Sequence, residues 1–139
     1  MNTETRTTIF STQIRVRIEN LNYGNHLSFN SLASMIQETN VQWLKSIHRD
    51  ATEIDIENNT GWVMKEIHIN YLSEGFYNDE IIFDVYLNEA KKTYLVFEYK
   101  IYNLTAGKDI ATAACKLAFV DKINRSIACI PQCISNIFL

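Results

Sequence analysis

The sequence predicts an α+β domain in which one long helix lies against a curled antiparallel sheet. A single segment with helical spacing, residues 28–48, follows a strand-like segment near the N-terminus. Four long segments rich in β-branched and aromatic residues come after it, separated by short turns. Strands joined by short turns form antiparallel sheets, so the predicted order is strand, helix and four strands.

The first predicted strand covers residues 6–18. Three aliphatic residues alternate with two arginines from Ile14 to Ile18. Alternation with a period of two predicts a strand with one face on the core and the other in water. The stretch that follows, ENLNYGNHLSFN at 19–30, contains four asparagines and cannot be ordinary core, because its side chains need many hydrogen-bond partners.

The predicted helix is amphipathic with a broad apolar face. Polar residues, Asn40 among them, lie between the apolar positions. Ser28 or Asn30 could cap its start by accepting hydrogen bonds from unpaired backbone N–H groups. The polar residues 49–60 predict a surface connection. The apolar face consists of Leu32, Met35, Ile36, Thr39, Trp43 and Ile47.

The later segments complete one predicted domain, residues 1–139. Residues 88–92 and 105–108 are predicted hairpin turns. The apolar tail, 127–139, could pack on the sheet or on a partner. No linker, repeat or low-complexity stretch divides the chain. The four strands are expected at 61–72, 80–90, 93–104 and 109–121.

Composition argues against several classes of function. The formal net charge is -3 and no basic run occurs, which disfavours nucleic-acid binding. The sequence contains no run of 18 apolar residues, so no membrane span is predicted. The N-terminus lacks signal-peptide features. Three cysteines, an odd count, favour reduced thiols and a cytoplasmic location. Cys129 and Cys133 have a spacing used by some metal sites, but no second pair complements them, so no metal is predicted.

Three segments in order resemble a known family. The first is VRIENLNYGNHL followed by the helix, the second IHINYLSEGFYNDEIIFDV and the third IATAACKLAFVDKINRSIACIP. Together, over about residues 10–131, the chain resembles hotdog-fold acyl thioesterases, the group that includes 4-hydroxybenzoyl-CoA, YbgC-like and plant acyl-ACP enzymes. The resemblance implies the hotdog fold, a long central helix wrapped by a curled five-stranded antiparallel sheet.

The resemblance also implies a function. An acyl-CoA or acyl-carrier-protein thioester would be hydrolysed to free acid and thiol without a cofactor or metal. The sites would lie between the subunits of a homodimer or homotetramer. One alternative is a hotdog protein that binds an acyl thioester without hydrolysing it. Another, a hydratase or dehydratase, is less favoured because those families share a proline-containing segment after a histidine, and the only proline here is Pro131.

Thioester hydrolysis needs hydrogen-bond donors for the developing oxyanion and a group that directs the attacking water. Backbone N–H groups at a helix start carry partial positive charge, so those of Leu27, Ser28 or Phe29 are candidate donors. Gly24 would let a substrate approach the backbone closely. His26 could donate a hydrogen bond or position water.

The general base is the open point in this site. Many relatives carry aspartates before a Gly-His pair, and alignment on His26 places Asn20 and Asn22 there. An asparagine cannot accept the proton usefully, although it can orient a water. Glu38 resembles the family's helix glutamate and could be the base or an anchor of the loop, and Glu19 is the other nearby carboxylate.

The resemblance therefore assigns catalytic roles to Asn22, His26 and Glu38. It assigns substrate binding to Asn20, Tyr23, Gly24, Asn25, Leu27 and Ser28. Structural roles compete with these assignments: His26 could simply satisfy the loop, the asparagines could build a turn, and Glu38 could be a buried anchor.

Other residues have weaker claims to a role. His68 is expected to be structural and His48 to lie at the helix end. Four basic side chains could meet CoA phosphates: Lys65, Lys91, Lys92 and Arg125. Three aromatic residues could line an acyl tunnel or serve packing: Tyr71, Phe76 and Tyr77.

Overall fold

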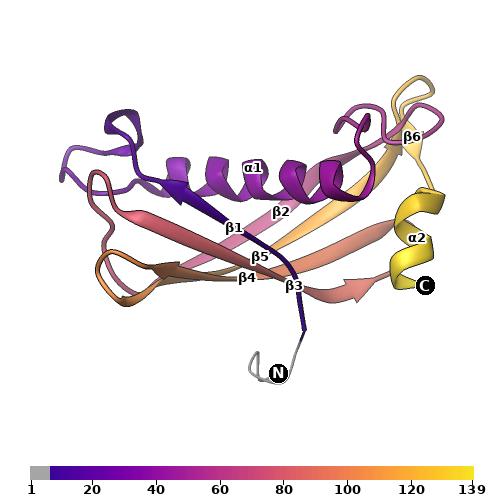
Figure 1. Cartoon of the computed structure of the whole chain (residues 1–139). Coiled ribbons are helices and arrows are strands. Elements are labelled where there is room, and N and C mark those ends of the chain that lie inside the picture. Colours follow the sequence, from indigo (N-terminus) through magenta and orange to yellow (C-terminus); the bar gives the residue numbers. More distant parts are fainter. Residues whose placement is uncertain (1–6) are drawn as a thin grey trace.

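A computed structural model describes residues 7–139, in which one long helix lies along one face of an antiparallel sheet (Figure 1). This arrangement confirms the predicted α+β hotdog fold. Residue 6, the start of the first predicted strand, lies outside the described residues. The elements are β1 (Thr8–Arg15), η2 (Ile18–Asn20), α1 (Phe29–Ile47), β2 (Thr60–Tyr71), β3 (Glu80–Ala90), β4 (Tyr94–Asn103), β5 (Lys108–Asp121), β6 (Ser126–Ile127) and α2 (Gln132–Phe138).

The sheet has the strand order β1-β3-β4-β5-β2, with every pair antiparallel and the short β6 beside β5. All five predicted strands are therefore present, and β6 adds a sixth. Strands β1 and β2 form the two edges of the main sheet. The centre is β4, where Tyr99 is paired with Val85 on one side and Ala113 on the other.

The first strand is shorter than predicted. It ends at Arg15, and Ile18, which was expected on the core face, is 70% exposed on the 3₁₀ turn η2. The Oδ1 atom of Asn20 accepts the N–H of Arg17 at 2.7 Å, and the Asn20 N–H donates to the Arg17 carbonyl at 3.0 Å. These local bonds offer the backbone a turn in place of the strand ladder.

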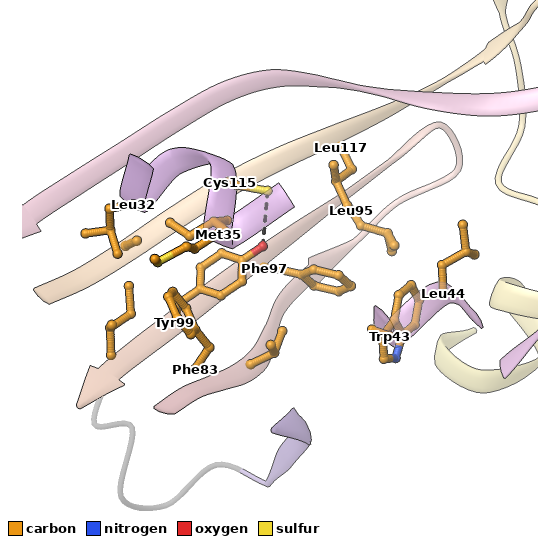
Figure 2. Close-up of a cluster of buried hydrophobic side chains, with 14 of the residues drawn as sticks. Leu32, Met35, Trp43, Leu44, Phe83, Leu95, Phe97, Tyr99, Cys115 and Leu117 are labelled. Atoms are coloured by element: carbon orange, nitrogen blue, oxygen red, sulfur yellow. Dashed lines mark hydrogen bonds between the residues drawn. The ribbon is translucent and has the colours of Figure 1, made fainter. Parts of the chain in front are cut away.

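The core lies between α1 and the inner face of the sheet. Leu32, Ile36 and Leu44 of α1 are fully buried. Trp43 meets Phe97 of β4 edge to face, with ring centroids 5.1 Å apart. Figure 2 shows Leu32, Trp43 and Leu44 of the helix together with Phe97 of the sheet in one cluster. The predicted apolar spacing of the helix is thus what fixes its orientation.

Asn40 departs from the prediction that placed it on the polar face. It is only 2% exposed, and its Oδ1 lies 2.5 Å from the Tyr99 hydroxyl. The Cys115 sulfur is 3.3 Å from the same hydroxyl, as the dashed line in Figure 2 marks. Burial raises the pKa of both Tyr99 and Cys115, so both keep their protons. Partners on β4 and β5 satisfy the buried amide, which lets a polar residue join the core.

The connection 49–60, which was expected at the surface, and the apolar tail both contribute to the core. In the connection 49–60, Ala51 and Ile56 are buried. In the tail, Ile134 is buried and Phe138 stacks on Trp43 with centroids 5.8 Å apart. The tail therefore packs on its own domain, at the end of the sheet where α2 lies (Figure 1). No helix within residues 7–139 is long and apolar enough to cross a membrane.

Candidate active site

Two segments distant in sequence meet at the start of α1. The Leu27 N–H donates to the Gly75 carbonyl at 2.7 Å, and the Tyr71 hydroxyl lies 3.3 Å from the Leu27 carbonyl oxygen. Leu27 is buried beneath this contact. The loop before α1 and the segment after β2 are therefore fixed side by side.

The asparagine-rich loop is a tight turn held by its own side chains. The Asn22 Oδ1 accepts the Gly24 N–H at 2.8 Å, and the Asn22 N–H donates to the His26 carbonyl at 2.9 Å. Asn25 has a positive φ of 65°, which asparagine tolerates better than most residues. The turn roles proposed for these asparagines, and for Asn20 in η2, are present in the structure.

His26 stands above this turn, half-buried. Its Nδ1 lies 3.3 Å from the Leu27 carbonyl oxygen and its Nε2 lies 3.9 Å from Oε1 of Glu74. A carbonyl oxygen only accepts, so Nδ1 is the donor in this contact. In the neutral ring Nε2 is then free to accept a hydrogen bond.

Gly24 lies directly against the ring of His26. A Cβ atom at this position would lie 2.9 Å from Cδ2 and 3.0 Å from Nε2 of His26. Any larger residue would therefore force the His26 ring to shift. The structure thus supplies a different reason for this glycine from the substrate access expected from the sequence.

A hollow of about 320 Å³ opens beside the histidine, lined by His26, Tyr71, Leu72, Ser73 and Glu74. Burial raises the pKa of Tyr71, so its hydroxyl remains a donor to Leu27. The Ser73 hydroxyl donates to the Asp109 carbonyl at 2.7 Å and ties the segment to β5.

The proximity of Glu74 to His26 was not predicted from the sequence. The two residues are 48 positions apart, and the loop of Glu74 is brought to the helix only by the fold. The available signal was the second family segment, INYLSEGF, which contains it.

The start of α1 has fewer free donors than predicted. The N–H groups of Leu27 and Ser28 were candidate donors, but Leu27 bonds Gly75, and Ser28 bonds the Asn20 carbonyl at 3.0 Å. The Ser28 hydroxyl caps the helix by accepting the Ser31 N–H at 3.1 Å. Among the described residues, the N–H groups of Phe29 and Asn30 have no acceptor, as expected for the first turn of a helix.

Glu38 does not join this group within one chain. It lies on the exposed face of α1, where its Oε2 accepts a hydrogen bond from Gln42 at 2.9 Å. Gln42 in turn accepts from Thr12 of β1. Ten residues of helix separate Glu38 from Ser28, a distance of about 15 Å along the axis. Glu38 therefore contacts neither His26 nor the loop.

The remaining candidates do not converge on His26. Glu19 and Tyr23 are exposed, as are Phe76 and Tyr77. His48 is the C-cap of α1, as predicted, and His68 is exposed on β2. The four basic residues proposed for phosphates are exposed: Lys65, Lys91, Lys92 and Arg125. Within residues 7–139, no three His, Cys, Asp or Glu side chains are grouped to hold a metal ion.

The fold and this arrangement define a hotdog protein with a helix-start site. The family model of the thioesterase-like superfamily matches residues 16–138. The chain therefore belongs to the thioesterase-like superfamily.

Solved structures have the same fold at low sequence identity. A candidate thioesterase from Pseudomonas aeruginosa superposes with a TM-score of 0.82 at 16% identity, covering 96% of this chain and 100% of that one. A 1,4-dihydroxy-2-naphthoyl-CoA thioesterase from Synechocystis gives 0.81 at 17% identity, covering 91% and 93%. A Staphylococcus aureus protein in complex with CoA gives 0.80 at 16%, covering 94% and 81%. No curated protein matches the sequence.

Proposed function

We propose that this protein is a thioester hydrolase that cleaves an acyl-CoA or acyl-carrier-protein thioester to the free acid and the thiol. The observation that carries this proposal is the pair of unbonded N–H groups, of Phe29 and Asn30, at the helix start that follows His26. A thioester carbonyl placed there would receive two donors and the positive end of the helix dipole as its oxygen gains charge.

The side chains around this start have separate roles in the proposal. His26 holds the attacking water through Nε2, because its Nδ1 is engaged with the Leu27 carbonyl. Asn22 maintains the turn on which the ring rests. The thiolate leaves readily because it is a stable anion, so the carbonyl attack is the step that the site must assist.

Two of the structural relatives favour CoA as the carrier. One is named as the thioesterase of a CoA ester and another was solved with CoA bound. We further propose that the working site lies between two subunits, because the hollow beside His26 borders β2, an edge strand of the sheet.

Hydrolysis of a panel of CoA esters tests the proposal. Acetyl-, octanoyl-, palmitoyl- and benzoyl-CoA would be incubated with the protein and the released thiol trapped with a chromogenic reagent. We expect turnover of at least one ester far above its rate in buffer. An acyl-carrier-protein ester of the same chain should be tested in parallel to separate the two carriers.

A binding protein without activity is the second candidate function. Both side-chain oxygens of Asn20 and Asn22, the residues that the resemblance aligns with aspartates of many relatives, accept backbone N–H groups, which favours this candidate. Tight binding of acyl-CoA with no thiol released from any ester would establish this candidate and overturn the hydrolase.

Gly24→Ala should reduce turnover while leaving the fold intact. The added methyl group would meet the His26 ring at about 3 Å and move it away from the water position. We expect a loss of about 10–100-fold in kcat, the usual cost of displacing a reacting group by about 1 Å. Steady-state kinetics and thermal unfolding measure both effects. Full activity in the variant would show that the ring position does not matter.

A further inference from the structure

The proposed hydrolase lacks an identified group to take the proton from the attacking water. Asn20 and Asn22 cannot accept it, and both oxygens already bind backbone N–H groups. Glu38, the helix candidate, bonds to Gln42 on an exposed face. Within one chain none of these three residues can take the proton, so another carboxylate near His26 is needed.

We infer that Glu74 is the general base of this site and that it shares the attacking water with His26. The inference rests on the proposed function and adds a residue to it. Glu74 Oε1 lies 3.9 Å from Nε2 of His26, and both side chains line the same hollow of about 320 Å³.

The distance of 3.9 Å is beyond that of a direct hydrogen bond, which ends near 3.2 Å for nitrogen and oxygen. The two groups therefore face each other with their acceptor atoms available. A single water can donate one hydrogen to each of them, and its lone pair then points to a third position. Nε2 of His26 stays an acceptor for this water because Nδ1 donates to the Leu27 carbonyl.

The backbone around Glu74 is held firmly at the helix start. Gly75 accepts the Leu27 N–H at 2.7 Å, and Ser73 bonds the Asp109 carbonyl at 2.7 Å. The two neighbours of Glu74 are thus anchored to the loop before α1 and to β5. Its side chain, 61% exposed, lies 3.9 Å from His26 at the hollow that both residues line, so a water bound there is within its reach.

Two other carboxylates near this end of the sheet, Asp79 and Glu80, are already committed. Asp79 accepts the Phe76 N–H at 2.9 Å and the Asn103 amide at 2.8 Å. Glu80 is bound by Arg15 at 2.8 Å. In contrast, His26 is the sole charged or polar partner of the Glu74 carboxylate among residues 7–139.

The step balances with water as the only co-reactant. Glu74 takes a proton from the water while the water oxygen bonds to the thioester carbon and the carbonyl oxygen becomes an oxyanion at Phe29 and Asn30. The carbon–sulfur bond then breaks with its electron pair on sulfur. Glu74 returns the proton to the sulfur, which gives the thiol, and the carboxylic acid product loses its own proton to solvent.

Glu74→Gln tests this role because glutamine keeps the shape and removes the base. With the CoA ester that the wild type hydrolyses fastest, we expect kcat to fall about 10²–10⁴-fold. The dissociation constant of the corresponding non-hydrolysable CoA thioether should change less than about threefold, because Glu74 contacts the water and not the ester. Glu74→Asp should recover part of the loss, and formate should restore activity to Glu74→Ala, which a merely structural residue would not show.

Two further variants make the result specific. Glu53→Gln, a charge-matched change in the connection after α1, should leave kcat unchanged. Full activity in Glu74→Gln, or a loss in Glu38→Gln with none in Glu74→Gln, would overturn the assignment while the hydrolase stands. If the wild type binds the thioether but hydrolyses no ester, the proposed function itself fails and this inference with it.

Discussion

His26→Ala should lower kcat by about 10²–10⁴-fold with little change in KM, the range expected when a group that positions or relays a proton is lost. The reason is geometric: Leu27 fixes Nδ1, the proposed mechanism assigns the attacking water to Nε2, and alanine removes both nitrogens. Thiol release from the best CoA ester measures the effect.

The control for this variant is another histidine. His48→Ala changes the C-cap of α1, at the opposite end of the helix from the site, and should keep full activity. Both variants should remain folded by circular dichroism, because His26 contributes no buried core contact. If His26→Ala hydrolyses the ester at the wild-type rate, the site lies elsewhere on the molecule.

The elements with strong periodicity were the ones that the sequence could predict. The expected helix 28–48 differs from α1 by one residue at each end, because the spacing of its apolar face and the Ser28 cap are local features. The strands agree within two residues, apart from the first. That strand lost its last three residues to a turn bonded through Asn20, a choice that alternation alone does not reveal.

The site was harder to predict because its geometry depends on contacts distant in sequence. The loop and its histidine could be recognised from one segment. The N–H groups of Leu27 and Ser28, however, donate to Gly75 and Asn20. These acceptors lie in the segment after β2 and in the turn η2, and only the folded chain defines their positions. The approach of Glu74 to His26 has the same origin. Asn40 was misplaced for a related reason, since its partners, Tyr99 and Cys115, lie on other strands.

The edge strand β2 borders the hollow beside His26 and has backbone groups that a second subunit could pair with. Its Leu72 N–H donates to the Ile110 carbonyl, toward β5. Because successive N–H groups of a strand point to alternate sides, those of Ile67 and Ile69 point away from β5, toward the open edge. At the N-terminal end of β2 the Trp62 N–H donates to the Glu53 carbonyl, away from β5. Even-numbered residues thus point outward there and inward at Leu72, because the register of β2 shifts between Met64 and Glu66.

Unpaired backbone N–H and C=O groups along an edge strand can pair with a strand of another chain. Among residues 7–139 no strand pairs with this edge of β2, which is 12 residues long against 8 for β1. Ile67 and Ile69 are also only partly buried at the edge and still pack on the core. We therefore propose that two copies of the chain pair along β2, which would bring a second subunit to the hollow beside His26.

Ile69→Pro should break such a dimer and lower its activity with it. Proline removes an outward N–H but is tolerated on an edge strand that faces solvent, so the isolated chain should still fold. Each lost backbone bond is worth about 1 kcal/mol and two-fold symmetry counts it twice, so dimer affinity should fall about 30-fold or more. Light scattering across a dilution series measures the assembly, and ester hydrolysis at the same concentrations measures the activity.

Ser11→Pro is the matched variant at the opposite edge. Val16 donates its N–H to Asp79, on the β3 side, so the N–H of Ser11, an odd number of residues away, points outward from β1. This variant should change neither assembly nor turnover. If Ser11→Pro dissociates the protein and Ile69→Pro does not, the subunits pair through β1. If both variants stay assembled and active, backbone pairing at an edge is not what joins the subunits, and the proposed pairing along β2 is wrong.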